Sequence, residues 1–332
     1  MKVRKTDAQR IKNELIDNDN LDRNYRTEAV GDFVFFPIKR EIVGFIEREM
    51  VKIARKPTSL KEVLAGVLGD EEIEKIVTSF DVVGGVAIVE IPVELEGKKG
   101  DIGEALMLVH KNVRTVAAKR GPMEGEFRVR KLEVIAGERN TETRYRESGC
   151  EFVFDIAKVY FSPRLSFERE RIAGLIKGNE RVLVMFAGVG PFPIVVARRN
   201  SGVEIAAVEL NPAAFEYLVG NIKLNRMERT ITPVCGDVRE VIPELFVGWA
   251  DRVLMPLPRG AEGFLDVALC GAKKGGVLHV YCFARVGEDG EKADEIARMI
   301  GKFGGKAKVL NIRTVRPFAP HVDQIVVDVE VC

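Results

Sequence analysis

Hydrophobic positions in the second half of the chain follow the pattern of a βαβ unit. Val182–Phe186 are continuously apolar, as in a strand buried on both faces of a parallel sheet. The bend Ala187-Gly188-Val189-Gly190 follows, and its glycines let the backbone turn sharply and let a ligand approach closely. A helix with two prolines in its first turn comes next. A second apolar strand, Glu204–Val208, then ends at an acid, Glu209.

The alternation of strands and helices continues toward the C-terminus. Strands are predicted over 230–235, 250–255 and 276–283, and helices over 213–224, 260–269 and 291–303. Two long strands, 306–315 and 324–331, close the chain, and the segment between them is too short for a crossover helix. The last strand should therefore pair antiparallel. A parallel sheet with one reversed hairpin predicts an α/β fold, that of the class I S-adenosylmethionine-dependent methyltransferases, with a Rossmann-like sheet and a terminal antiparallel hairpin.

Patterns in the first half predict smaller α+β domains. We expect a small domain over 1–56, a linker over 57–70, a basic α+β domain over 71–160 and the domain of the parallel sheet over 161–332. In the first domain a helix should run from Thr6 to Asp17, and a strand should cover Asp32–Ile38. In the basic domain, Asp81–Ile91 should be a strand bent at its glycines. A helix over 102–110 and strands over 113–117, 128–135 and 151–160 should follow it.

The charge of the chain is nearly balanced, with 51 basic and 50 acidic residues, so any surface for nucleic acid must be local. Nine basic and five acidic side chains lie between Arg114 and Arg146, an excess of four positive charges. Such an excess is typical of a phosphate-binding surface. Arginines that alternate along a strand also suit an ordinary solvated face.

The cysteines and the hydropathy of the chain indicate the cellular compartment. The five cysteines are scattered without a Cys-x-x-Cys pair, which favours a reducing compartment and argues against structural zinc. The start of the chain is hydrophilic, and no apolar run approaches about 18 residues, so neither a signal peptide nor a membrane span is predicted. We therefore expect a cytoplasmic protein without a metal site.

The glycine bend discriminates between nucleotide ligands. A dinucleotide fingerprint requires a third glycine where this chain has Pro193, and the bend lacks the Gly-Lys-Ser/Thr ending of a P-loop. An adenosyl ligand without phosphates fits better, held by the backbone of the bend and by an acid on its ribose, which predicts S-adenosylmethionine as the cofactor. The cofactor contacts expected at the ends of the strands are Phe186, Ala187, Gly188, Gly190, Glu209, Asp237 and Pro256.

The segment Tyr160–Arg171 joins the basic domain to the parallel sheet, where a substrate delivered by one meets the methyl group held by the other. Tyr160 and Phe161 are predicted to stack on a base. Arg164 is predicted to hold the carboxylate of the cofactor or a phosphate, and Glu168 to take a proton. The alternative interpretation is the start of a helix with solvated charges.

The fourth strand of the parallel sheet ends in Met255-Pro256-Leu257-Pro258. Methyltransferases of exocyclic base amines place Asn or Asp there to accept a hydrogen bond from the amine, and Pro256 cannot accept one, which disfavours amine methylation. Methylation of a pyrimidine carbon requires a thiolate near this strand end, where no cysteine stands. Cys270 and Cys282 are expected in the core.

Three groups of motifs along the chain resemble one known family. They are Leu21-Asp-Arg-Asn-Tyr25 with Gly31–Pro37, Ala136–Thr143 with Glu147-Ser-Gly149, and Asp155–Leu165 with Glu168-Arg169. These motifs extend over essentially the whole chain. It resembles the archaeal and eukaryotic tRNA (guanine-37, ring nitrogen 1) methyltransferases, a family that includes archaeal enzymes of wyosine formation.

The resemblance implies a first domain that checks the outer corner of tRNA, a second that grips the anticodon stem and a third that methylates. Carried over by position, Glu168 is the general base, Arg128 the partner of the guanine oxygen and Tyr160 a stacking residue. The implied cofactor contacts are Arg169, Glu209, Leu210, Asp237 and Val238. Further substrate contacts are expected at Pro258, Arg130, Arg139 and Arg144.

One position departs from the family pattern. Guanine-specific members carry Asn-Leu-Pro where this chain has Pro256-Leu257-Pro258. The change resembles the subgroup that methylates both guanine 37 and carbon 7 of 4-demethylwyosine, so a relaxed pocket that accepts both bases is expected. Two other hypotheses remain: methylation of a protein or small metabolite with the front domains as a lid, and a non-catalytic RNA-binding protein with a vestigial nucleotide fold. We expect a monomer because three domains already supply a binding surface.

Overall fold

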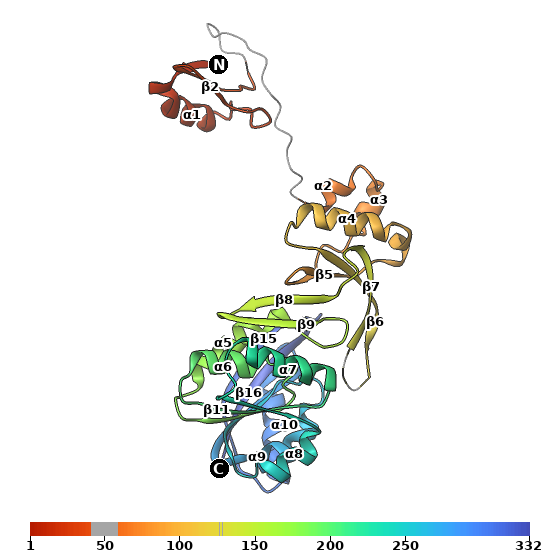
Figure 1. The fold of residues 1–332 in the computed structure, drawn as a ribbon, viewed down its shortest axis with the longest axis vertical. Helices are drawn as coiled ribbons and strands as arrows, with labels where there is room; N and C mark the ends of the chain where they lie inside the picture. The colour runs from red at the N-terminus through yellow and green to blue at the C-terminus, as the bar shows by residue number, and fades with distance from the viewer. Residues whose placement is uncertain (41–58, 126, 128) are drawn as a thin grey trace. The chain divides into compact units, whose positions relative to one another are not determined.

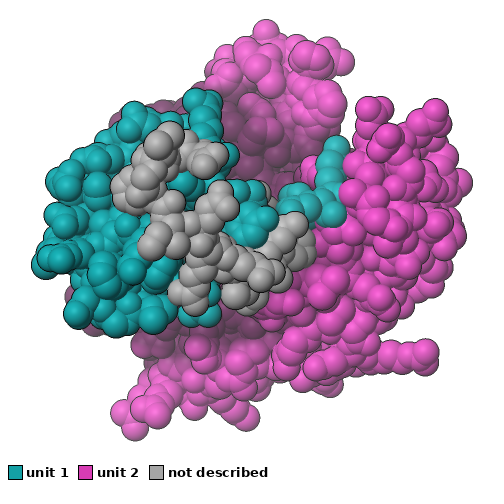
Figure 2. Space-filling model, turned by 90° about the horizontal axis from the view of Figure 1, so that it is seen from above, with its two compact units in different colours: residues 1–62 teal, residues 63–332 magenta. Residues whose placement is uncertain are grey.

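The computed structural model describes residues 1–40, 59–125, 127 and 129–332. Contacts between Cα atoms divide the chain into two compact units, Met1–Glu62 and Val63–Cys332 (Figures 1 and 2). The division falls inside the predicted linker, residues 57–70. The second unit therefore includes both the basic α+β part and the parallel sheet.

Residues 1–40 of the first unit form a small antiparallel sheet with one helix. Its three strands lie in the order β1-β3-β2, and a 3-10 turn leads into the helix. The bounds are β1 (Lys2–Arg4), α1 (Ala8–Asp17), β2 (Glu28–Val30) and β3 (Phe33–Phe35). Val3, Leu15 and Phe36 form its buried core. Leu15 is the one fully buried residue of α1, and Ala8 and Ile11 of the same helix pack against this core.

The second unit begins with a four-stranded sheet in the order β4-β5-β6-β7. Its elements are α2 (Leu60–Leu64), α3 (Asp70–Glu74), β4 (Asp81–Val83), β5 (Val86–Val89), α4 (Lys99–Val109), β6 (Thr115–Glu124) and β7 (Val129–Gly137). The bent single strand predicted over Asp81–Ile91 is wrong. Val83 pairs with Val86, so the two glycines between them close a tight hairpin. Gly84 has φ +58°, which glycine adopts without steric cost.

A two-stranded hairpin, β8 (Glu142–Glu147) and β9 (Cys150–Asp155), follows the four-stranded sheet. Two buried asparagines, one in α7 (Pro212–Leu224) and one directly after it, hold this hairpin against the next part of the unit. Asn221 Oδ1 accepts the backbone N–H of Val153 at 2.8 Å, and Asn225 Oδ1 accepts that of Glu151 at 3.0 Å. These bonds satisfy backbone groups that a hairpin edge would otherwise leave unpaired.

The remainder of the unit is a seven-stranded sheet in the order β12-β11-β10-β13-β14-β16-β15. Its strands are β10 (Arg181–Val184), β11 (Glu204–Glu209), β12 (Ile231–Cys235), β13 (Ala250–Met255), β14 (Ala272–Arg285), β15 (Ala307–Ala319) and β16 (Val322–Val331). The first five pair in parallel, and β16 pairs antiparallel with both β14 and β15. The predicted terminal antiparallel hairpin is confirmed.

Helices cover both faces of this sheet (Figure 1). They are α5 (Ser166–Leu175), α6 (Pro191–Arg199) and α7 on one face, and α8 (Val238–Leu245), α9 (Leu265–Gly271) and α10 (Asp289–Lys302) on the other. Because side chains alternate along a strand, Val182 and Val184 enter one buried cluster while Leu183 and Met185 enter the other. The first cluster also takes in Phe152 and Phe154 of β9, so one core runs from the hairpin into the sheet.

Candidate active site

The glycine bend and the acid of the next strand are joined directly. Glu209 ends β11, and its two carboxylate oxygens accept backbone N–H groups of Gly188 at 2.7 Å and of Asn211 at 2.8 Å. The bend itself is fixed by a hydrogen bond from Ala187 N to Val208 O at 2.9 Å. Bend and acid both lie at the carboxyl ends of adjacent strands, where open α/β sheets bind ligands.

The two glycines of the bend serve different purposes. Gly188 has φ +58°, and a Cβ placed on it would meet nothing within 4 Å. Gly190 has φ +92°, and a Cβ there would lie 2.7 Å from Cδ1 of Leu218. Gly190 is thus required by packing against α7, whereas Gly188 leaves open space above the backbone. That space can admit a ligand.

The electrostatics of Glu209 follow from its surroundings. Burial raises the pKa of its carboxyl, and backbone N–H groups of Asn211, Gly188 and Leu210 oppose that rise. A carboxylate held this way keeps lone pairs for hydroxyl donors from a ligand, as a ribose would supply.

The ends of the neighbouring strands complete this edge of the sheet. Asp237 follows β12 and caps α8 by accepting the N–H of Arg239 at 2.8 Å, while Val238 behind it is buried. Pro256 and Pro258 follow β13 and are half-buried. Phe186 packs edge-on against Phe264 with ring centroids 5.0 Å apart. The predicted cofactor residues of the bend and of these strand ends thus gather at one sheet edge.

Glu168 lies in the first turn of α5 and is buried, with 4% of its surface exposed. Arg171 donates to both carboxylate oxygens, from Nη2 to Oε1 at 2.8 Å and from Nε to Oε2 at 2.9 Å. The hydroxyl of Tyr281 on β14 donates to Oε1 at 2.7 Å. Glu168 is therefore not the solvated charge of the alternative interpretation.

A buried chain of polar groups continues behind Arg171. Arg171 Nη1 donates to Asp328 on β16 at 3.0 Å, and His279 Nδ1 lies 2.7 Å from the same carboxylate. Burial lowers the pKa of His279. Burial alone would raise the pKa of Asp328, but the hydrogen bonds that Asp328 accepts from His279 and Arg171 lower that pKa overall. A neutral His279 donates from Nδ1 to Asp328 and accepts at Nε2 from Arg252 at 3.2 Å. The chain fixes the orientation of Arg171, and through it that of Glu168.

Two of the predicted cofactor contacts, Arg169 and Arg164, form ion pairs with earlier strands. Arg169 is 1% exposed and forms a two-bond ion pair with Glu147 of β8, with contacts of 2.5 and 2.6 Å. Arg164 is exposed and donates from Nε to Asp81 of β4 at 2.7 Å. Both arginines tie α5 and the turn before it to the preceding strands.

The predicted substrate residues are divided between surface and core. Tyr160 is 39% exposed, whereas Phe161 packs against Phe154 with ring centroids 4.6 Å apart and is partly buried. Arg139 is exposed, and Arg144 is exposed but pairs with Glu151. Arg128, the predicted partner of the guanine oxygen, lies outside the described residues. Phe161 therefore supports the hairpin core, and Tyr160 presents the accessible ring.

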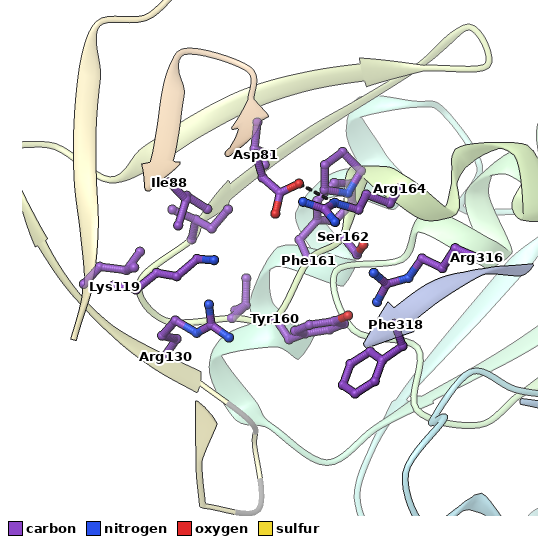
Figure 3. Close-up of a pocket in the computed structure, with 15 residues that line it drawn as sticks. Asp81, Ile88, Lys119, Arg130, Tyr160, Phe161, Ser162, Arg164, Arg316 and Phe318 are labelled. Atoms are coloured by element: carbon purple, nitrogen blue, oxygen red, sulfur yellow. Dashed lines mark hydrogen bonds and ion pairs between the residues drawn. The ribbon is translucent and has the colours of Figure 1, made fainter. Parts of the chain in front are cut away.

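A pocket of about 210 Å³ lies where the four-stranded sheet, the segment before α5 and the end of β15 meet (Figure 3). We call it the seam pocket, lined among others by Lys119, Arg130, Tyr160, Arg164, Arg316 and Phe318. Figure 3 shows Lys119, Arg130 and Arg316 extending toward Tyr160 from different strands. Neither Glu168 nor the glycine bend is among its lining residues.

Sequence reasoning missed Tyr281, Arg171 and Asp328 around Glu168, and Arg316 and Phe318 in the seam pocket. The first group carries no local signal because Tyr281 is 113 and Asp328 160 positions from Glu168. Arg316 and Phe318 were assigned to the turn between the last two strands, but β15 continues to Ala319 and carries them to the seam.

Comparison with known proteins identifies the family. A model described as the TRM5/TYW2 methyltransferase domain matches residues 143–309. Models of the TYW2 N-terminal domain and of the tRNA methyltransferase 5 N-terminal domain match residues 60–141 and 1–46. The chain belongs to the TRM5/TYW2 methyltransferase family. The family and the fold class predicted from the motifs and the strand pattern are thereby confirmed.

Two relatives in this family match the chain over all or about two thirds of its length. The tRNA (guanine(37)-N(1))-methyltransferase Trm5b of Pyrococcus abyssi is 40% identical over 100% of this chain and 98% of its own length. The tRNA (guanine(37)-N(1))/4-demethylwyosine(37)-methyltransferase Taw22 of Nanoarchaeum equitans is 34% identical over 66% of this chain and 88% of its own length.

Solved structures of family members share the fold. The complex of aTrm5 with tRNALeu has a TM-score of 0.86 at 36% identity and covers 100% of this chain and 99% of that chain. TYW2 of Methanocaldococcus jannaschii in complex with AdoMet has a TM-score of 0.60 at 28% identity and covers 76% of this chain and 99% of that chain. Among the described residues, no helix is long and apolar enough to cross a membrane.

Proposed function

We propose that this chain uses S-adenosylmethionine to methylate N1 of guanine 37 in tRNA. The observation that carries the assignment is the match along the whole chain, at 40% identity, to a methyltransferase of that nucleotide. The two competing hypotheses from the sequence do not explain this match. The matched relative is an enzyme, and its substrate is a tRNA nucleotide.

The glycine bend fits the adenosyl part of the cofactor on two observations. Apart from Gly188 and its chain neighbours, no protein atom lies within 4 Å of the position that a Cβ on Gly188 would occupy, and the Glu209 carboxylate accepts the N–H of Gly188. Glu209 would accept hydrogen bonds from the ribose hydroxyls, while Phe186 and the residues after β12 and β13 would border the adenine. When bound, S-adenosylmethionine supplies an electrophilic methyl group on a sulfonium.

Glu168 is the base that we propose for the reaction. The N1 atom of guanine carries a proton at neutral pH, so its lone pair becomes available only as that proton leaves. A carboxylate has about four acceptor positions, and Arg171 and Tyr281 occupy three of them on Glu168. The remaining position, on Oε2, is the one that would receive the N1 proton. General-base help of this kind is worth about 10²–10⁴ in rate.

Reaching Glu168 requires the base to leave the anticodon stack, which costs a few kcal/mol. The exposed ring of Tyr160 would offset part of that cost by stacking on the extruded nucleotide. Arg128, outside the described residues, would stabilise negative charge on the guanine oxygen.

A second substrate, 4-demethylwyosine at the same position, is favoured by the strand end after β13. Pro256 presents no side-chain donor or acceptor there, so the edge of the base is not held by a specific hydrogen bond. The 34% identity to the bifunctional Taw22 supports this extension. We propose that the pocket accepts both bases.

The partner is tRNA, and we propose that the second unit grips the anticodon stem while the first contacts the outer corner. The similarity of the full chain to aTrm5, which was solved with tRNALeu, supports this. A monomeric state and a cytoplasmic location stay predictions.

Mass spectrometry of nucleosides tests the proposal. Unmodified tRNA is incubated with the protein and S-adenosylmethionine, then digested, and position 37 is analysed. We expect 1-methylguanosine at position 37 and, with tRNA that carries 4-demethylwyosine, a second methylated product. Absence of a methyl group at position 37 in both substrates would reject the assignment.

A further inference from the structure

The seam pocket carries an excess of positive charge. Arg316 Nε donates to the neutral Gln324 at 2.9 Å, so this hydrogen bond does not cancel the guanidinium charge. Nε of Arg130 is buried and has no hydrogen-bond partner in the described part of the chain. The acid of the pocket, Asp81, is already engaged by Arg164. The pocket is therefore suited to an anionic ligand.

Two aromatic rings are exposed beside these cations. Tyr160 is 39% and Phe318 46% exposed. The ring of Phe318 is backed by Phe283 with centroids 4.1 Å apart, and the guanidinium of Arg316 lies 5.9 Å from its centroid. Exposed aromatic faces next to cationic side chains are the combination with which proteins hold unstacked nucleotides, base on ring and phosphate on cation.

The pocket adjoins the proposed reaction site, because Tyr160, which we propose stacks on the target base, lines it. Glu168 and the glycine bend do not line it. Moreover, its volume of about 210 Å³ is below the range of about 300–1,000 Å³ typical of pockets for drug-sized ligands. The pocket therefore has room for one base, and beside a target base stacked on Tyr160 that base would be a neighbour of the target in the loop.

We propose that the seam pocket binds one nucleotide of the anticodon loop that directly flanks the methylated nucleotide. Its base stacks on Phe318, and Arg316 and Arg130 hold its phosphate. Capturing the neighbour keeps the loop splayed while the target base is extruded, so the pocket contributes to kcat/KM and to preference for the flanking base. This inference rests on the proposed function for its choice of RNA, but the pocket can be tested separately.

A double-mutant cycle between protein and RNA tests the inference. The tRNA is assembled with an abasic nucleotide at position 36 or at position 38, and single-turnover kcat/KM is measured for the wild-type protein and for Phe318→Ala. Leu310→Ala is the matched control, because Leu310 lies on the same strand with the same 46% exposure but does not line the pocket. Arg313→Ala is the matched control for Arg316→Ala, because Arg313 lies on the same strand but does not line the pocket.

We expect one abasic position to lower kcat/KM of the wild-type protein by about 5- to 100-fold, the range of base–aromatic stacking. On the same substrate Phe318→Ala should lower kcat/KM little further, because removing the ring and removing the base abolish the same stacking interaction. Leu310→Ala should behave as wild type. Additive losses at both positions, or equal behaviour of Phe318→Ala and Leu310→Ala, would overturn the inference.

Two further measurements distinguish a contact with the anticodon loop from a site for free mononucleotides. If the pocket serves free mononucleotides instead, millimolar guanosine 5′-monophosphate should inhibit the wild type but not Phe318→Ala, without any coupling to positions 36 and 38. If the wild-type protein does not methylate intact tRNA, the proposed function fails. The same cycle measured on tRNA affinity by filter binding would then test the pocket alone, and coupling between Phe318 and one flanking base is still the expected result.

Discussion

At the residue scale, Gly188 and Gly190 lack a Cβ for different structural reasons. Both have positive φ, but a side chain would collide with the protein only at Gly190. We expect the adenosyl group to occupy the free space at Gly188, so the lack of a side chain on Gly188 makes room for the cofactor. The residue types of the bend could be interpreted from the sequence, but the difference between the two glycines could not, because it depends on Leu218 of α7.

Gly188→Ala should therefore weaken the binding of S-adenosylmethionine by at least about tenfold, because the methyl group enters the space of the ligand. Equilibrium dialysis with labelled cofactor measures the affinity. Gly248→Ala is the control, since Gly248 has φ +57° and equally open surroundings at the opposite end of β13. Both variants carry the same left-handed strain of about 1–2 kcal/mol. Equal cofactor affinity in the two variants would contradict the site.

Tyr281→Phe should slow single-turnover methylation by about tenfold, since the Glu168 carboxylate loses the hydrogen bond that holds Oε1 and is less well oriented toward the base. Burial and the nearby Glu168 raise the pKa of Tyr281 well above its usual value, so the hydroxyl stays a donor at any working pH. Affinities for tRNA and cofactor should not change. Tyr217→Phe, which removes a hydroxyl that contacts Glu142 on the surface, should leave the rate unaltered.

At the scale of elements, regular patterns with local signals were predicted well. The strands of the parallel sheet and the final hairpin follow from apolar runs and from a connection too short for a helix. Elements whose pairing depends on distant partners were not found. β8 was missed because its alternating charges, Glu142-Thr-Arg-Tyr-Arg-Glu147, read as a solvated face, whereas in the structure Glu147 is buried against Arg169 of α5.

That ion pair joins α5, which carries Glu168, to the β8–β9 hairpin. Glu147→Gln should destabilise the second unit by about 3–5 kcal/mol, because it leaves the guanidinium of Arg169 buried without its counter-charge. Denaturant unfolding followed by circular dichroism measures the loss. Glu151→Gln, whose partners Arg144 and Arg146 are exposed, should cost under about 1 kcal/mol. Similar losses for both would show that the buried pair does not anchor α5.

For the whole molecule, balanced total charge hides a strong local asymmetry. The chain has a net charge of +1, yet the segment between Arg114 and Arg146 carries an excess of four positive charges. The seam pocket could not be predicted from the sequence, because it forms only when the four-stranded sheet meets the last hairpin of the seven-stranded sheet.

Affinity for tRNA should fall with salt. An excess of four positive charges facing phosphates predicts a slope of log affinity against log salt of about −3. Filter binding over a salt series measures it. Arg139→Ala should make the slope shallower by about one unit, whereas Arg144→Ala should change it less because Glu151 already pairs with Arg144. A slope near zero would exclude phosphate contacts as the basis of binding.

The central claim is that the buried Glu168 carboxylate takes the N1 proton of guanine 37. Single-turnover methylation of that nucleotide by Glu168→Gln measures it most directly, because glutamine keeps the size of the side chain and removes the base. We expect the rate to fall by about 10²–10⁴, with affinities for tRNA and S-adenosylmethionine unchanged. A rate within about threefold of wild type, with both ligands bound as tightly, would contradict the account.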